Sequence, residues 1–155
     1  MKVLPDLYPT DLDAPPANVL TLPRGLIGFE QYNQAELLYQ RDHLPFLWLK
    51  LIGPRDHLQF IVIEPGGIVP EYEPELFDEH AIALDLHDAN EAMVLNIVTL
   101  KRQNPVEATV NLIGPIIINR RTRVGQQVVI SNYSRYSAHH SLMERTQTVG
   151  RAINH

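Results

Sequence analysis

The chain has 155 residues, of which 45% are hydrophobic and 20% charged, and this suits one globular domain. It contains no cysteine, which excludes disulfides, thiolate metal ligands and cysteine nucleophiles. Its apolar runs are strand-sized, far below the ~20 residues that span a bilayer, and no signal-peptide pattern follows Met1. We therefore expect a soluble, cytoplasmic protein.

The net charge of −5 conceals two parts of opposite sign. Residues 1–100 hold 16 acidic residues against 5 Lys or Arg, whereas residues 101–155 hold 2 against 8. Between Arg55 and Lys101 there is no Lys or Arg. This asymmetry favours a basic partner on one surface and disfavours nucleic acid there. The plain alternative is a solvated acidic surface.

Twelve prolines and eight glycines separate short runs rich in Val, Ile, Leu and aromatic residues, a pattern typical of an all-β domain. Residues 1–17 carry four prolines and predict an irregular leader, with a possible edge strand at Met1–Leu4. The strands that we expect next are, in chain order, Asn18–Leu22, Ala35–Gln40, Phe46–Ile52, Leu58–Glu64 and Glu91–Lys101.

Residues 68–91 allow two interpretations. Glu75–Leu84 predicts a short helix, whereas Ile82–Leu86 could instead extend as a strand. In the helical interpretation, one face carries Leu76, Phe77, His80, Ile82 and Ala83.

The C-terminal third continues the strand pattern and then turns polar. Glu107–Asn119 predicts one long strand, bent near Gly114 and Pro115 because proline cannot donate a ladder hydrogen bond. We expect Gln126–Ile130 to form a hairpin with this strand. Further along, Ser137–Arg145 suggests a short helix.

So many strands in one small chain leave sheet edges to protect, and closing the sheet removes them. Phe60–Ile63 and Ile116–Ile118 are apolar on both strand faces. One face can fill a barrel, and the other needs cover from residues 75–84, the C-terminal segment or a partner. We predict an all-β fold with one or two short helices, organised as a small, partly open β-barrel.

The sequence offers little catalytic chemistry. It lacks the glycine-rich phosphate loops, the serine-hydrolase elbow and the zinc-protease motif. His139 and His140 are adjacent, and neighbours on a strand point to opposite faces, so they rarely ligate one metal together. We expect no catalytic residue, cofactor or metal site, with a small metal-dependent hydrolase as the weaker alternative.

Arg120, Arg121 and Arg123 lie in the predicted hairpin turn and could bind phosphate. A direct RNA-binding barrel is therefore an alternative hypothesis. Such proteins normally present a wider basic face with aromatic stacking. We interpret the cluster as a solvated hairpin tip and expect no direct nucleic-acid binding.

Glu71, Glu73 and Glu75 alternate with Tyr72 and Pro74. If this segment is extended, the three carboxylates line one face. Like charges at this spacing repel, which predicts an exposed setting rather than an acid/base pair. The segment is either a solvated rim or a docking site for a basic partner, and Glu71, Tyr72, Glu73 and Glu75 are the candidate contacts.

Three segments of the chain carry further motifs. The first reads Leu-Pro-Arg-Gly-Leu-Ile-Gly-Phe-Glu over 22–30, and the second combines 45–49 with 60–65. The third and most specific covers 108–119 and continues through Thr122, Gly125 and the following glutamines. Together these segments resemble the FliW family of flagellar assembly factors. The sequence departs from the family pattern mildly, with Gly114, Lys50 and Glu64 where Ala, Gln and Asp or Asn are usual.

The resemblance implies one FliW-like domain over 18–140, between the leader 1–17 and a polar tail 141–155. It implies two alternative partners in the cytoplasm: flagellin, bound before export, and CsrA, a translational repressor that binds flagellin mRNA. On this interpretation, export of flagellin frees the factor to capture CsrA and relieve repression, with no covalent chemistry. We expect a monomer without a membrane partner.

Several residues of the family motifs are of types that turns, bends and cores require, and we expect them to be structural. In particular, core packing is the expectation for Trp48. These residues are Pro23, Gly25, Gly28, Phe29, Trp48, Asn111, Pro115 and Gly125.

Overall fold

The structure is a computed structural model that describes residues 1–3, 18–103 and 105–143. Most of the expected leader and of the expected polar tail lies outside the described residues. At the possible edge strand, Lys2 forms an antiparallel bridge with Glu75. The division of the chain at positions 17 and 140 stays a prediction.

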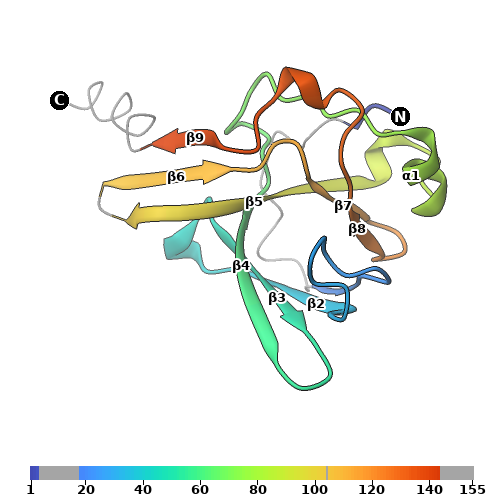
Figure 1. The fold of residues 1–155 in the computed structure, drawn as a ribbon, viewed down its shortest axis with the longest axis horizontal. Coiled ribbons are helices and arrows are strands. Elements are labelled where there is room, and N and C mark those ends of the chain that lie inside the picture. The colour runs from blue at the N-terminus through green and yellow to red at the C-terminus, as the bar shows by residue number, and fades with distance from the viewer. Residues whose placement is uncertain (4–17, 104, 144–155) are drawn as a thin grey trace.

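Strands dominate the described part of the chain, and the sheet has nine of them. They follow the order β1-β2-β3-β4-β5-β6-β9, while β7 pairs with β5 and β8 (Figure 1). The strands are β1 Val19–Thr21, β2 Gln34–Leu38, β3 Leu47–Ile52, β4 His57–Ile63, β5 Ala92–Gln103, β6 Val106–Val110, β7 Ile116–Asn119, β8 Gly125–Gln127 and β9 His140–Met143. The helices are α1 Asp78–Ala83 and the 3₁₀ turns η1 Arg41–His43, η2 Ala89–Glu91 and η3 Tyr133–Arg135.

The long strand β5 joins two parts of the sheet. Its first residues pair with β7, from Ala92 opposite Asn119 to Leu95 opposite Ile116. Its later residues pair with β6, beginning at Val98. The other edge of β5 pairs with β4. The strand β5 therefore positions both β6 and the hairpin of β7 and β8.

Two apolar clusters lie on opposite faces of the central strands. One, between β1–β5 and β7, contains Leu49, Leu95 and both Ile116 and Ile118. The other contains Ile117 and is covered by side chains from residues 69–86. All four residues of β7 are buried. The prediction that Ile116–Ile118 needs cover on both faces is thus confirmed, and residues 69–86 provide much of that cover.

The all-β class is confirmed, but the predicted barrel is wrong. Within the described residues, β1 and β9 end the strand order and do not pair with each other. A single parallel bridge links Thr21 to Val124, where the Thr21 N–H donates to the Arg123 carbonyl at 2.9 Å. The turn around Gly25 leads the chain away after three strand residues, so β1 is too short to close the sheet.

The predicted single bent strand is in fact two strands. The chain turns at Asn111, whose side-chain oxygen accepts hydrogen bonds from the Ile113 and Gly114 N–H groups, each at 3.0 Å. This local turn competes with the ladder. As a result, β6 and β7 pair with different stretches of β5. The predicted hairpin between β7 and β8 is confirmed.

The predicted helix exists but is shorter, and its buried face is different. Phe77 and Ile82 are exposed, whereas Ala81 and Leu84 are buried. The chain stays extended up to Phe77, so the helix begins later and turns other residues inward. The alternative strand at Ile82–Leu86 is wrong.

The helix expected near Ser137–Arg145 is also wrong in its described part. Residues 140–143 form β9, which pairs with β6 from Val110 opposite His140 to Glu107 opposite Met143. Pairing with a distant strand overrides the local helix preference of this segment.

Candidate partner-binding site

An extended acidic segment crosses the surface between the N-terminal residues and the segment that follows β8. We define the acidic strip as residues 71–75. Glu71 and Glu75 are exposed and Glu73 is half-buried, while Tyr72 and Pro74 point inward and are buried. The alternation predicted from sequence is therefore present, with the three carboxylates on one outward row.

Hydrogen bonds hold the strip from both sides. On one side, the Val3 N–H donates to the Pro74 carbonyl at 3.2 Å, and the Lys2 ammonium lies 3.1 Å from a Glu73 carboxylate oxygen. On the other side, the Ser131 N–H donates to the Glu75 carbonyl at 2.7 Å. Asn132 accepts from the Glu75 N–H and donates to the Glu73 carbonyl, both at 2.9 Å. These contacts hold the strip in an extended conformation between residues 2–3 on one side and residues 131–132 on the other.

Tyr72 anchors the strip and does not reach the surface. Its side chain is 2% exposed, and its hydroxyl donates to the Leu112 carbonyl at 2.7 Å and accepts from Asn96 Nδ2 at 3.1 Å. Burial raises the pKa of Tyr72 well above its ordinary value. Of the four candidate contacts, only the three carboxylates face outward, and Tyr72 acts by holding them in place.

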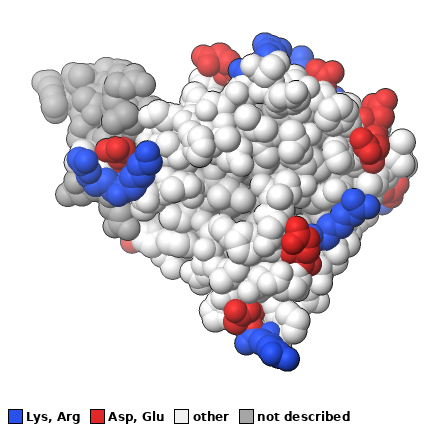
Figure 2. All heavy atoms as spheres, viewed as in Figure 1, with Lys and Arg blue, Asp and Glu red and all other residues white. Residues whose placement is uncertain are grey.

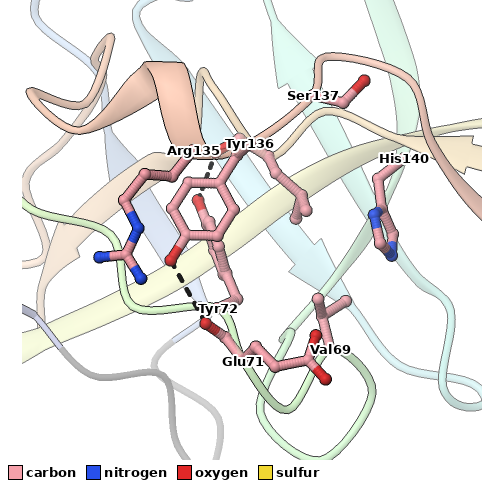
Figure 3. A pocket seen from close by; sticks show the side chains of 8 residues that line it. Val69, Glu71, Tyr72, Arg135, Tyr136, Ser137 and His140 are labelled. Carbon is pink, nitrogen blue, oxygen red and sulfur yellow. Dashed lines mark hydrogen bonds between the residues drawn. The ribbon is translucent and has the colours of Figure 1, made fainter.

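A cavity of about 310 Å³ opens beside the Glu71 end of the strip (Figure 3). Its wall includes Tyr136, whose hydroxyl accepts from the Glu73 N–H at 2.9 Å and donates to the Glu71 carbonyl at 3.3 Å. The Arg135 guanidinium lies 5.9 Å from the centre of the Tyr136 ring. The lining residues are Val69, Glu71, Tyr72, Leu112, Arg135, Tyr136, Ser137 and His140.

The lining of this cavity combines apolar and charged groups. Val69, Leu112 and two tyrosine rings supply apolar surface, and the polar groups carry charges of both signs. The volume lies at the small end of the range for ligand cavities and can hold one large side chain. Sequence reasoning missed this cavity because its residues come from three separate segments.

The predicted histidine pair is divided by the strand geometry. His140 begins β9 and lines the cavity, whereas His139 precedes the strand and is exposed. The described residues contain no group of three His, Cys, Asp or Glu side chains that could hold a metal ion.

The predicted arginine cluster does lie in the turn between β7 and β8, but Arg121 is engaged within the protein. Its Nε donates to Glu91 Oε2 at 3.0 Å, and its Nη2 donates to Asp85 Oδ2 and the Asp85 carbonyl, both at 3.1 Å. Hydrogen bonds to Glu91 lower its pKa below the ordinary value. The bond from the His87 N–H has the largest effect, and the bond from the Arg121 guanidinium has the next largest. Two carboxylates thus neutralise the positive charge of Arg121, which a phosphate would need for binding.

The side chain of Asn119 holds the same turn through hydrogen bonds. Its side chain is fully buried and donates to the Leu84 and Asp85 carbonyls, at 2.8 and 3.1 Å. Its oxygen accepts from the Arg121 and Thr122 N–H groups, at 2.8 and 3.2 Å. The turn and residues 84–85 therefore form one connected unit.

Residues from the family-like segments meet around Gln127. Its Oε1 accepts from the Ile27 N–H and its Nε2 donates to the Gly114 carbonyl, both at 3.0 Å. Gly25 has a φ of +62°, and a Cβ there would lie 2.3 Å from the Phe29 carbonyl oxygen. These contacts fit a structural role.

Two aromatic residues of the motifs differ in their packing. Phe29 is half-buried and meets Phe60 edge to face, with ring centres 5.3 Å apart. Trp48 is also half-buried, not fully in the core, because it alternates with the buried Leu47 and Leu49 on β3. Its Nε1 donates to His43 Nδ1 at 3.3 Å.

The distribution of charge completes the description of the surface. Figure 2 shows acidic side chains at the margin where Figure 1 places α1, and a broad area without charged side chains across the centre of the view. Among the described residues, no helix combines the length and the apolar character needed to cross a membrane. The fold and site define a small, open-sheet β protein whose surface carries an acidic strip beside a cavity.

Comparison with known proteins identifies the group to which such a protein belongs. The FliW protein family model matches residues 7–142, so the chain belongs to the FliW family. It is 33% identical to the flagellar assembly factor FliW of Leptospira interrogans serovar copenhageni over 127 residues, 82% of this chain and 81% of that one. It is 35% identical to the factor of the same name from Natranaerobius thermophilus over 133 residues, 86% and 87% of the two chains.

A solved structure agrees. The crystal structure of a flagellar assembly factor FliW superposes with a TM-score of 0.67 at 26% identity, covering 91% of this chain and 95% of that one.

Proposed function

We propose that this protein is a flagellar assembly factor that binds flagellin in the cytoplasm as a chaperone-like partner and also binds CsrA. Binding CsrA would antagonise its repression of flagellin mRNA translation. Membership of the FliW family, whose relatives carry the name flagellar assembly factor, is the observation that carries the proposal. The function is an exchange of partners governed by mass action and requires no bond to be made or broken.

The acidic strip supports the CsrA part of the proposal. CsrA binds RNA and is therefore expected to present basic surface. The three carboxylates lie on one outward row, in a stretch of chain without Lys or Arg. Glu73 is paired with Lys2, and the exposed Glu71 and Glu75 offer the complementary charge. Such charges chiefly raise the rate of encounter and make it dependent on salt.

The test begins with size-exclusion chromatography of the protein with purified flagellin and with CsrA, separately and together. We expect a complex with each partner at micromolar concentration, and competition when both are present. Failure of both complexes to form would contradict the proposal.

Reversing the strip tests its contribution. In the variant Glu71→Lys, Glu73→Lys, Glu75→Lys we expect the association rate with CsrA to fall roughly tenfold at low salt, with a flatter salt dependence. Stopped-flow or surface-based kinetics at several salt concentrations would measure both. The matched control reverses Glu36, Asp42 and Glu107, which lie on β2, η1 and β6. An equal effect in the control would show that net charge, not the strip, governs association.

A further inference from the structure

The two strands that end the sheet, β1 and β9, differ in how their outer edges are used. On β1, the Thr21 N–H donates to the Arg123 carbonyl at 2.9 Å, so another part of the chain engages that edge. On β9, residues 140–143 pair with β6 along one edge, and no other strand of the described chain pairs with the second (Figure 1). We call this second edge the outer edge of β9.

The outer edge of β9 is a regular template for one more strand. Its residues, His-Ser-Leu-Met, include neither proline nor Lys, Arg, Asp or Glu. The pairing of β9 with β6 runs in register from Val110 opposite His140 to Glu107 opposite Met143. Proline, charged side chains and bulges are the usual means of blocking a strand edge. Because β9 has only four residues, an added strand needs a further contact to bind firmly.

The cavity described above offers that further contact. His140 lines the cavity, and in Figure 3 its ring points into the same space as Val69 and Glu71. Its partner on β6, Val110, is buried in the apolar cluster that contains Tyr72, another lining residue. Directly opposed residues of neighbouring strands point to the same face of a sheet, with Cβ atoms ~5 Å apart. A residue placed opposite His140 on an added strand therefore directs its side chain to the face that carries the cavity.

The inner walls of the cavity are apolar and fixed in place. Val69 and Leu112 are buried and supply aliphatic surface. The rings of Tyr72 and Tyr136 meet edge to face, with centres 5.0 Å apart. Both hydroxyl groups are hydrogen-bonded to backbone groups, so neither ring has to move before a ligand enters. Such walls favour a large apolar side chain, above all an aromatic one.

The charged groups around the cavity favour neither sign. Glu71 and Arg135 both line it, and both are exposed. A charged side chain that entered would be attracted by one of them and repelled by the other. An uncharged side chain avoids this conflict and the cost of leaving water with a charge. The matching ligand is thus an extended polypeptide that inserts one large, uncharged side chain.

We propose that a segment of flagellin adds as a strand to the outer edge of β9 and places one large apolar side chain in the cavity. The inference rests on the proposed function, in which flagellin is the chaperone-like partner. Backbone pairing holds the extended segment, and the cavity selects its register. A subunit that awaits export has not yet made its contacts with other subunits, so its segments are available for pairing. Glu71 borders both the cavity and the acidic strip, which makes binding of flagellin and of CsrA compete.

The first test is residue-resolved hydrogen exchange on the unaltered full chain, free, saturated with purified flagellin, or saturated with CsrA. Backbone hydrogen-bonding groups alternate between the two edges of a strand. In the free protein, the N–H groups of 140–143 that point to β6 are protected, and those on the outer edge exchange fast. We expect the fast ones to slow by roughly tenfold or more with flagellin and to keep their rates with CsrA.

The second test fills the cavity. Ser137→Trp places an indole ring at a lining position, and the control Ser134→Trp adds the same ring to η3, outside the lining. Both serines are exposed. We expect the dissociation constant for flagellin to rise about tenfold or more in Ser137→Trp and less than about threefold in the control. Affinity for CsrA should stay unchanged in both. Thermal melting checks the fold of the variants, and the exchange experiment needs no variant.

The outcomes separate this proposal from the proposed function. If the wild type binds flagellin but the outer-edge N–H groups exchange as in the free protein, strand addition is refuted and the proposed function stands. If Ser137→Trp folds and binds flagellin with wild-type affinity, the role of the cavity is refuted. If CsrA instead protects the outer edge, the assignment to flagellin is overturned. If the wild type is a dimer whose outer edge is already protected, a second copy is the occupant. If the wild type binds neither protein, the proposed function itself fails.

Discussion

The turn between β7 and β8 and the acidic strip each concentrate charge of one sign in the sequence, and the fold treats them differently. In the turn, Arg121 lies within 3.1 Å of carboxylate oxygens of Glu91 and Asp85. In the strip, Glu73 is paired with Lys2, but Glu71 and Glu75 are exposed on the outward row, and the segment is held mainly through its backbone. A charge run that is tied to its own chain stabilises the fold, whereas one that faces outward is available to a partner.

The largest effect on this comparison should come from Asn119→Ala. The substitution removes the acceptor for two N–H groups and the donor to two carbonyls in a fully buried position. We expect the free energy of unfolding to fall by about 3 kcal/mol, because buried polar groups would lose their partners. Urea denaturation measures it, and Asn90→Ala, in the exposed turn η2, is the control. An equal loss in both variants would mean that the turn is not a stabilising unit.

A smaller and more selective effect should separate Arg121→Gln from Glu71→Gln with Glu75→Gln. The arginine variant should lower the denaturation midpoint measurably and leave the association rate with CsrA unchanged. The double glutamine variant should slow association and leave the denaturation midpoint unchanged, since the contacts of Glu71 and Glu75 with Tyr136, Ser131 and Asn132 run through their backbone. Denaturation and binding kinetics on the same two proteins test the crossed pattern. Parallel losses in both assays would remove the distinction between the two regions.

The smallest effect should appear in the pH dependence. The pKa of Glu91 is lowered from 4.5, first by the His87 N–H and then by Arg121. A carboxyl with a lowered pKa in the folded state stabilises the protein above its unfolded pKa, and this contribution is lost as the pH falls through the folded value. We therefore expect Glu91→Gln to flatten the loss of stability below pH ~4.5. Denaturation midpoints between pH 6 and 3 would show it, and a curve parallel to the wild type would contradict it.

Much of the sheet was predictable because its strands are short apolar runs bounded by proline and glycine. β3, β4 and β5 lie within one or two residues of their predicted limits. What failed depended on contacts distant in sequence. Residues 140–143 form a strand only because β6 is beside them, and the split at Asn111 depends on a side-chain turn that strand periodicity does not reveal.

The candidate site divides in the same way. The outward row of Glu71, Glu73 and Glu75 follows from a period of two, which the sequence displays directly. The sequence predicts Phe77 on one helical face with Leu76 and His80, because the pattern does not show that the extended backbone continues to Phe77 and that the helix begins at Asp78. The cavity could not be predicted, since it requires residue 112 and residues 135–140 to meet residues 69–72.

The hydrogen bonds on both sides of the strip have a consequence for any molecule that docks there. They hold Glu71, Glu73 and Glu75 in an extended row, and two strand residues span about 6.6 Å. The three carboxylates therefore lie at a fixed spacing. An opposing chain matches it with every second residue of an extended segment or, at ~5–6 Å, with residues three or four apart on a helix. Since these hydrogen bonds already hold the segment extended, no loop has to become ordered when a partner binds.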